Sequence, residues 1–256
     1  MNSMIPIGEI RRKKKVPIMT WMLIIVNVAI FVYCLLKGPA YYGGIIQKYG
    51  MVPYDILCGR RLHTIITSMF LHGGLMHLIG NMMFLLIFGP GVESRIGRTR
   101  FMELYLGSGI VASFAHIVIL LLFSEPIIVY GPFGYSEIDP LKIPCIGASG
   151  AISGLLGAYM VLLPNVLLDV LTMIGPIPMI IRIPAAVFIF FWFLYQLYMG
   201  TVSISFGFYS GVAFWAHIGG FIAGLVMAPS LGKEVRRKRR VRVDYAGRIW
   251  YEVPVK

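Results

Sequence analysis

Two side chains that could carry nucleophilic chemistry lie in apolar stretches of this sequence. Ser149 is part of Gly147-Ala148-Ser149-Gly150, and His217 is part of Ala216-His217-Ile218-Gly219-Gly220. A serine in an apolar helix can bond back to a carbonyl one turn earlier, but a histidine has no comparable partner in hydrocarbon. Serine becomes a good nucleophile when a neighbouring base takes its proton. The two residues therefore indicate chemistry inside a membrane.

The composition is that of an integral membrane protein. Of the 256 residues, 58% are hydrophobic and 13% are charged, and the mean hydropathy is +0.80. Soluble domains are about 45–50% apolar and about 25% charged. Six stretches are long enough to cross about 30 Å of hydrocarbon. They lie at approximately 16–36, 66–90, 101–123, 145–163, 183–199 and 211–230.

The expected fold is an all-α polytopic bundle of six transmembrane helices. The second stretch is overlong, and Gly73-Gly74 near its start predict a helix that begins at about 74. Residues 64–72 would then form a re-entrant or interfacial piece. The chain divides into a basic N-terminal segment (1–15), a six-helix transmembrane domain (16–231) and a basic C-terminal tail (232–256).

Basic residues predict the orientation in the membrane, because Lys and Arg concentrate on the cytoplasmic side. Six spans place both termini on one side. Most of the 23 basic residues fall on that side, in 11–15, 95–100, 182 and 233–256. The others are Lys37, Lys48, Arg60, Arg61 and Lys142. We expect both termini to be cytoplasmic and the protein to lie in the plasma membrane.

The net charge of +12 is explained by this topology, so no nucleic-acid partner is expected. The basic run 235–240 is suited to attract anionic lipid headgroups. Beyond it, the alternating segments 241–245 and 250–253 predict a small hairpin around Ala246-Gly247.

Four polar side chains share one depth in the predicted bundle. His77 and Asn81 come early in the second span, Ser149 early in the fourth and His217 early in the sixth. These spans all run from outside to inside, so all four side chains belong to the outer half of the bilayer. His77 and Asn81 are four residues apart and share one helix face. Such groups need partners or water, which predicts a wet cavity open to the outside.

Small residues indicate which helices touch. Gly150, Gly154 and Ala158 recur every fourth residue in the fourth span, and Ala216, Gly220 and Gly224 do so in the sixth. Such stripes let helix backbones approach closely in lipid. Since Ser149 and His217 each adjoin the head of a stripe, a tight crossing of these helices would bring them within hydrogen-bond reach.

These motifs, in this order, resemble the rhomboid family of intramembrane serine proteases. The resemblance covers roughly 50–230, and Glu93-Ser94-Arg95-Ile96-Gly97 supports it. Its main motifs are Leu71-His72-Gly73-Gly74-Leu75-Met76-His77-Leu78-Ile79-Gly80-Asn81, Gly147-Ala148-Ser149-Gly150-Ala151 and Ala216-His217-Ile218-Gly219-Gly220.

The resemblance implies a role for each matched residue. Ser149 would be the nucleophile and His217 the general base and then acid. The oxyanion would be held by the backbone N–H of Ser149 and the side chains of His77 and Asn81. The substrates would be single-span membrane proteins cut near the outer leaflet, with no cofactor and no metal. Glycines of the helix contacts would pack beside the site: Gly147, Gly150, Gly154, Gly220 and Gly224.

The sequence departs from the family pattern at two places. Some members have a tyrosine four residues after the nucleophile, stacked on the base, where this chain has Ser153. Trp215 and Tyr159 are candidates to orient His217 instead. Many relatives also have a tryptophan beside the residue that matches Arg61, and its absence puts the anchoring of the first outer loop in doubt.

The charge-free, glycine-punctuated segment 200–214 precedes the helix of His217 and could cap the cavity. In the resembled family this loop and the fifth span move to admit substrate. We therefore expect lateral access beside the aromatic run 190–193 of that span, with simple exposure of these rings to lipid as the alternative.

Other classes of protein fit the sequence less well. A transporter would have repeated halves or paired interrupted helices, and neither is apparent. A catalytically silent rhomboid-like binding protein usually lacks the serine or the histidine. His72 and His77 do not have metalloprotease spacing. Cys34, Cys58 and Cys145 make no disulfide framework, although a Cys58–Cys145 bridge stays open. Nothing in the sequence indicates an oligomeric state.

Overall fold

The computed structural model describes residues 5–9, 16–131, 134–174, 177–206, 211–238, 240–245 and 249–254. Most of these residues are helical. The six long or central helices are α1 (Ile18–Leu36), α5 (Leu75–Ile96), α6 (Arg98–Phe123), α7 (Ser149–Leu162), α8 (Ala185–Ser205) and α9 (Phe214–Lys238). Short helices connect them: α2 (Pro39–Tyr49), α3 (Pro53–Leu57), α4 (Thr64–Thr67), η1 (Ser68–Phe70) and η2 (Pro140–Lys142).

The helices confirm an integral membrane bundle that crosses the bilayer several times. Among the described residues, five helices are long and apolar enough to span it: α1, α5, α6, α8 and α9 over Phe214–Gly232. The sixth, α7, has only 14 residues, so the expected span over 145–163 is too long. Every residue of α7 from Gly150 to Tyr159 is buried among the other helices, and a helix enclosed in this way need not match the hydrocarbon thickness.

The ends of the second and fifth predicted spans also change. The second span begins at Leu75, close to the expected 74, but continues through Pro90 to Ile96. The piece before it is the short pair α4 and η1, which lies beside the bundle. The fifth span runs to Ser205, so the expected loop over 200–214 contains the last turns of α8.

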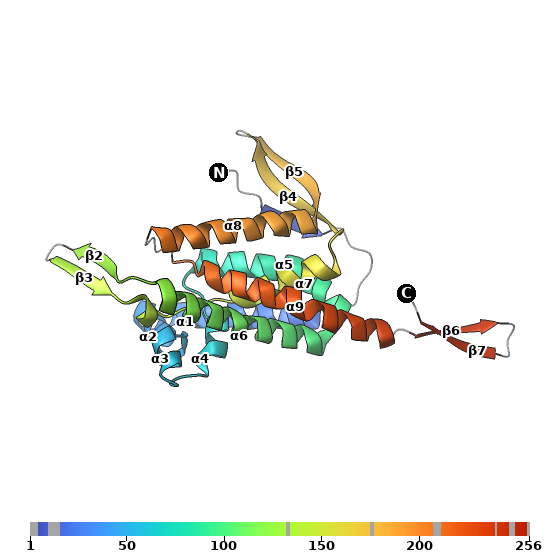
Figure 1. Cartoon of the computed structure of the whole chain (residues 1–256), viewed down its shortest axis with the longest axis horizontal. Helices are drawn as coiled ribbons and strands as arrows, with labels where there is room; N and C mark the ends of the chain where they lie inside the picture. Colours follow the sequence, from blue (N-terminus) through green and yellow to red (C-terminus); the bar gives the residue numbers. More distant parts are fainter. Residues whose placement is uncertain are drawn as a thin grey trace.

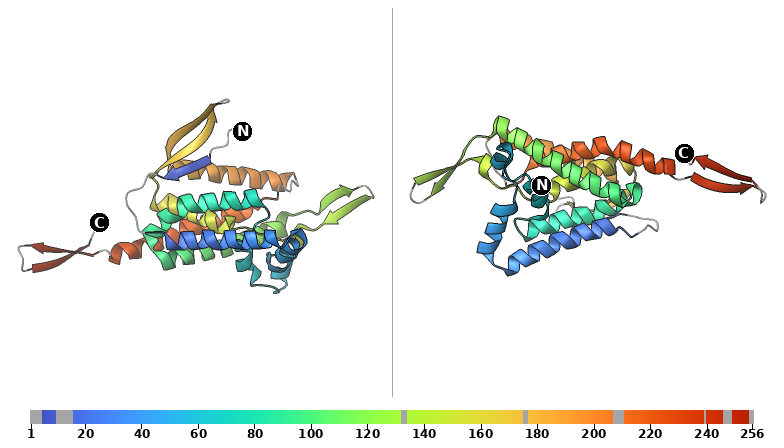
Figure 2. Two further views of the ribbon diagram at one scale, coloured as in Figure 1. Left: turned by 180° about the vertical axis from the view of Figure 1, so that it is seen from behind. Right: turned by 90° about the horizontal axis from the view of Figure 1, so that it is seen from below.

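The helices lie side by side with their connections at two opposite ends (Figure 1). One end carries α2, α3, α4 and the hairpin of β2 (Ile127–Gly131) and β3 (Gly134–Ile138). At the other end α9 extends beyond the bundle, and the further views in Figure 2 agree. Arg100 belongs to this second end, where its guanidinium donates to the carbonyl of Leu231 at 3.2 Å.

Three small sheets accompany the helices. The hairpin of β4 (Leu167–Ile174) and β5 (Ile177–Pro184) joins α7 to α8, and β1 (Ile5–Glu9) pairs antiparallel with β4. Neither this sheet nor the β2–β3 hairpin is anticipated by an all-α fold. The hairpin predicted around 246–247 is confirmed as β6 (Arg240–Tyr245) and β7 (Ile249–Pro254).

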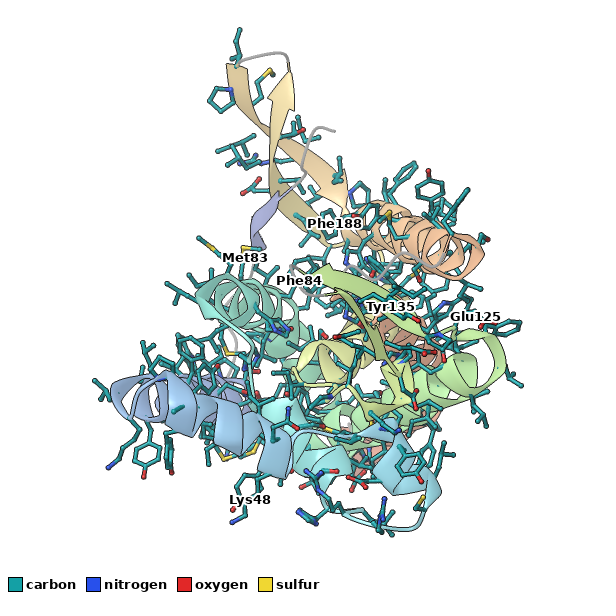
Figure 3. The ribbon with its side chains drawn as sticks, turned by 90° about the vertical axis from the view of Figure 1, so that its left-hand side faces the viewer. Lys48, Met83, Phe84, Glu125, Tyr135 and Phe188 are labelled. Atoms are coloured by element: carbon teal, nitrogen blue, oxygen red, sulfur yellow. The ribbon has the colours of Figure 1, made fainter. Side chains whose placement is uncertain are left out.

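Buried contacts fix the membrane helices to one another. Glu93 of α5 is 4% exposed and accepts hydrogen bonds from Met19 N–H at 3.1 Å and from Thr20 N–H at 2.9 Å. It therefore caps α1, whose first N–H groups have no partner within their own helix. Figure 3 looks along the bundle and shows Phe84 of α5 facing Phe188 of α8, with ring centroids 6.3 Å apart.

Candidate active site

Helices α7 and α9 pack with their backbones in contact. A Cβ added at Gly220 would collide with the carbonyl oxygen of Gly150, and one added at Gly224 would collide with that of Gly154. Both collisions would be far closer than the 3.0 Å that real Cβ contacts respect. These glycines therefore set the distance between the helix that carries Ser149 and the helix that carries His217.

An extended segment delivers Ser149 to the head of α7. The backbones of Met51 and Cys145 exchange hydrogen bonds of 3.1 and 2.8 Å, and Gly147 N–H donates to the carbonyl of Ser68 at 2.9 Å. Gly147 has a φ of +125°, which only glycine adopts at low cost. Because Ser149 is the first residue of α7, its N–H has no acceptor within the helix and lies at the positive end of the helix dipole.

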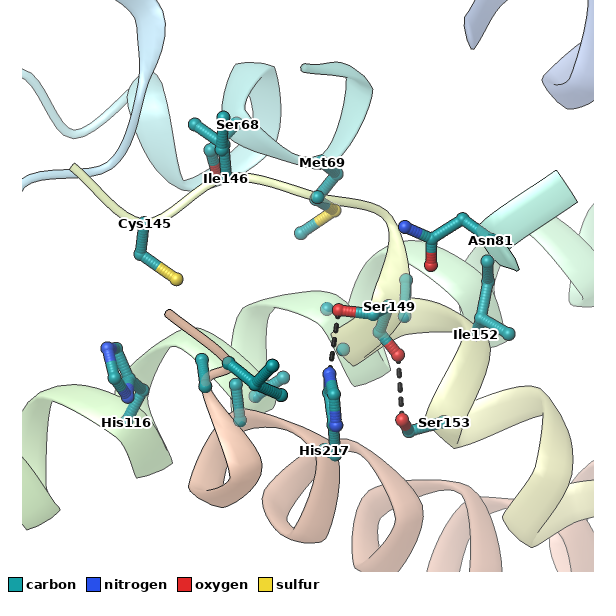
Figure 4. Close-up of a pocket in the computed structure, with 18 of the residues that line it drawn as sticks. Ser68, Met69, Asn81, His116, Cys145, Ile146, Ser149, Ile152, Ser153 and His217 are labelled. Carbon is teal, nitrogen blue, oxygen red and sulfur yellow. Dashed lines mark hydrogen bonds between the residues drawn. The ribbon is translucent and has the colours of Figure 1, made fainter. Parts of the chain in front are cut away.

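The side chains of Ser149 and His217 are in hydrogen-bond contact. Ser149 Oγ lies 2.8 Å from His217 Nε2, and both residues are partly buried (Figure 4). The carbonyl of Ser149 accepts a 2.7 Å hydrogen bond from Ser153 Oγ, so the residue at the family's tyrosine position braces the first turn of α7. This is the arrangement in which an imidazole can take the hydroxyl proton.

The other ring nitrogen of His217 contacts Gln196 of α8, with Nδ1 and Oε1 2.8 Å apart. Neither residue suggested by the sequence has this position: Trp215 donates to the carbonyl of Gly200 at 3.1 Å, and Tyr159 packs edge-on against Phe88. Gln196 was not predicted as a site residue from the sequence. Its signal was an amide in an apolar span, which is a functional-site candidate in its own right.

Two aromatic rings flank the imidazole. The ring centroid of Trp192 lies 6.2 Å from that of His217, and the ring of Phe214 stands edge-on at 6.4 Å. Thus α8 supplies both an aromatic neighbour and the polar partner of His217.

His77 and Asn81 line the same cavity as the serine and the histidine. Gly73 N–H donates to His77 Nδ1 at 3.3 Å, so in a neutral His77 the proton is on Nε2. That nitrogen faces the loop before Ser149, where a Cβ on Gly147 would lie 2.7 Å from it. Asn81 is buried and donates to the carbonyl of His77 at 3.1 Å, and the view in Figure 4 shows it beside Ser149.

The cavity has a volume of about 590 Å³. Exposed residues at its rim, among them Met76 (80% exposed) and Val212 (47% exposed), belong to the end of the bundle where α5 and α9 begin. A substrate segment or water can therefore reach Ser149 from this end. The lining also includes Met69, Ala112 and His116.

The first loop is anchored by Arg61 although the chain lacks the tryptophan that many relatives have beside this residue. Its guanidinium donates to Asp55 at 2.8 Å and to the carbonyl of Lys48 at 2.7 Å, and its backbone has a φ of +52°. The loop so held leads from α2 to the α4–η1 piece, whose Ser68 accepts the bond from Gly147.

His72 lies behind the cavity and is 1% exposed, so it is more enclosed than an interfacial residue would be. Burial lowers the pKa of His72 to about 3, and the neighbouring His77 contributes to the shift. Its ring stands edge-on to that of His77 with centroids 5.1 Å apart, and its backbone carbonyl accepts a hydrogen bond from the hydroxyl of Tyr42. His72 is thus a neutral packing partner of His77.

The chain is similar in sequence to proteins that are already known. Residues 59–234 match the Rhomboid domain family. The chain belongs to the rhomboid family. A putative rhomboid protease of Bacillus subtilis (strain 168), YdcA, is 37% identical over 106 residues, which cover 41% of this chain and 44% of that protein.

Two further relatives align over more of the chain. The rhomboid protease GluP of Bacillus subtilis (strain 168) is 26% identical over 84% of this chain and 35% of its own length. Rhomboid protein 1, mitochondrial, of Saccharomyces cerevisiae is 28% identical over 80% of this chain and 51% of its own length. The chain therefore spans about half or less of the curated relatives it matches.

Proposed function

We propose that this protein is an intramembrane serine endopeptidase that cleaves transmembrane-helix substrates near the outer leaflet with Ser149 and His217. The observation that carries the proposal is the 2.8 Å contact between Ser149 Oγ and His217 Nε2 at the wall of a cavity inside the helix bundle. The match of the chain to the rhomboid family and the aromatic, apolar surroundings of the two residues support the same reaction.

The chemistry follows from the positions of the groups. His217 Nε2 takes the proton of Ser149 as Oγ attacks the scissile carbonyl carbon, and the carbonyl oxygen becomes an oxyanion. The N–H of Ser149, the Nε2–H of His77 and the amide of Asn81 are the proposed donors to that oxyanion. Imidazolium then protonates the leaving amine, the C–N bond breaks and an acyl-enzyme forms. Water attacks this ester with His217 again as base, which releases the acid and restores Ser149.

The proposed substrates are single-span membrane proteins whose helix unwinds near its outer end. A regular helix hides its carbonyls in its own hydrogen bonds, so local unwinding must precede attack. We propose lateral access between α5 and α8, beside the aromatic run of α8. At that contact Phe84 of α5 lies against Phe188 and Trp192 of α8. Elsewhere on α8 Phe190 and Phe191 are exposed, whereas Phe193 stacks on Phe221 with centroids 4.4 Å apart.

Cross-linking tests this route. Phe84→Cys with Phe188→Cys places a thiol on each side of the α5–α8 contact, where the native ring centroids are 6.3 Å apart. Joining the two thiols with a reducible cross-linking reagent should slow cleavage, and reduction should restore it. Cleavage at an unchanged rate by the cross-linked protein would remove the α5–α8 route while leaving the chemistry intact.

We propose a plasma-membrane protein with both termini cytoplasmic, built from a basic N-terminal segment (1–15), the protease domain (16–231) and a basic tail (232–256). The basic residues at one end of the bundle and the bacterial relatives support this orientation, while some relatives carry mitochondrial names. Reporter fusions at each terminus test it: exposure of either terminus on the outer face would contradict the proposal.

The direct test of function is cleavage of a single-span test substrate by the detergent-solubilised protein. Wild type should cleave it, whereas Ser149→Ala and His217→Ala should not. Substrate binding without cleavage in wild type would favour a silent binding protein, and cleavage that survives in either variant would refute the assignment of the pair.

A further inference from the structure

Gln196 is a buried amide on an apolar helix. Its side chain is 4% exposed, and every other residue of α8 from Ala185 to Met199 is apolar or aromatic. An amide in such surroundings is unfavourable unless its oxygen and nitrogen have partners. Gln196 has one at each end: His217 Nδ1 at 2.8 Å and the carbonyl of Trp192 at 3.5 Å.

These two partners fix which way the amide faces. The carbonyl of Trp192 only accepts hydrogen bonds, so the amide end beside it is Nε2, and Oε1 faces His217. The opposite orientation would set two carbonyl oxygens against each other. Since Oε1 only accepts, Nδ1 of His217 must carry the hydrogen in their 2.8 Å contact.

The hydrogen on Nδ1 determines what Nε2 can do. A neutral imidazole has one N–H, so Nε2 has a free lone pair, and this nitrogen lies 2.8 Å from Ser149 Oγ. In the other tautomer Nε2–H would donate to the serine and could not take its proton. After proton transfer, Oε1 still accepts from Nδ1–H of the imidazolium.

We propose that Gln196 is a positioning residue that holds His217 in the tautomer competent to deprotonate Ser149. This inference rests on the proposed function and adds a third member to the pair, drawn from α8. The imidazole has aromatic neighbours in Trp192 and Phe214, whose rings restrict its position but cannot select its tautomer.

Substitutions of matched size separate this role from simple packing. Gln196→Met keeps the length and volume of the side chain but removes the acceptor, while Gln196→Glu keeps an acceptor at the same place. We expect Gln196→Met to lower kcat by about 10–100-fold, with KM within about twofold, and Gln196→Glu to stay within about fivefold of wild type. A purely structural role predicts the reverse order, because Met suits an apolar span and a carboxylate does not.

The experiment measures kcat and KM of full-length protein on the single-span test substrate, with thermal unfolding of each variant. Tyr198→Met, at a 65% exposed position of α8, is the control and should keep the wild-type kcat. Gln196→Asn keeps the amide but shortens its reach, so it should lose activity as Gln196→Met does. It replaces Gln196→Met in the test if that variant does not fold.

Three outcomes decide the matter. A kcat of Gln196→Met or Gln196→Asn within about threefold of wild type, or a Gln196→Glu variant slower than Gln196→Met, would overturn the role of Gln196. Those results leave the proposed function standing as long as wild type cleaves and Ser149→Ala does not. If wild type shows no cleavage that depends on Ser149, the proposed function fails and this inference fails with it.

Discussion

Gly220→Ala is the sharpest structural perturbation of the proposed pair. The added methyl would meet the carbonyl oxygen of Gly150, a backbone atom of α7, well inside the 3.0 Å limit for real Cβ contacts. The two helices must then separate by about an ångström. The 2.8 Å contact between Ser149 and His217 spans that interface, so it would open beyond hydrogen-bond length.

A misplacement of about 1 Å at a reacting centre costs about 100-fold in rate, so we expect Gly220→Ala to lower kcat by at least that factor. The assay is cleavage of the test substrate in detergent, beside gel filtration and thermal unfolding to establish that the variant is folded. Gly44→Ala is the matched control, because a Cβ there meets nothing within 4 Å. A folded Gly220→Ala enzyme with kcat within about threefold of wild type would refute the reasoning.

Three further predictions concern the supports of the site. Glu93→Ala should lower the midpoint temperature of thermal unfolding, because α1 loses a buried carboxylate cap whose hydrogen bonds contribute about 1.5–3 kcal/mol each. An unchanged midpoint would contradict this prediction. Alkylation at pH 8 should modify exposed Cys58 and spare Cys145, because burial raises the pKa of the Cys145 thiol to about 11. Equal labelling of the two cysteines in a peptide map would contradict this prediction. The pKa of His72 is lowered to about 3 in the folded protein, so below about pH 6.5 the unfolded chain binds a proton that the folded protein does not. Stability should therefore fall as the pH drops below about 6.5, and His72→Phe should flatten that decline. Identical pH profiles of wild type and His72→Phe would exclude the effect.

The membrane bundle was predictable because hydropathy and glycine spacing report directly on lipid exposure and helix contact. The stripes that contain Gly154 and Gly224 are local patterns, and the structure has these two backbones in contact. The family motifs likewise lie on contiguous segments. The length of α7 was not predictable in this way, because a helix enclosed by others is as apolar as one that faces lipid.

The contacts of His217 could not be read from spacing. Gln196 lies 21 residues before it on another helix, and only the packing of α8 against α9 brings the two side chains together. Proximity in sequence favoured Trp215, whose indole turns to Gly200 instead. The pairing of β1 with β4 was missed for a similar reason, since it joins segments more than 150 residues apart.

Covalent labelling of Ser149 by a fluorophosphonate tests the central claim, that His217 activates this serine inside the bundle. The reagent traps a serine whose proton is removed by a neighbouring base. We predict that peptide mapping will find the label on Ser149 of wild type and that it will be lost in both Ser149→Ala and folded His217→Ala. Labelling of Ser149 at the wild-type rate in His217→Ala would contradict the account.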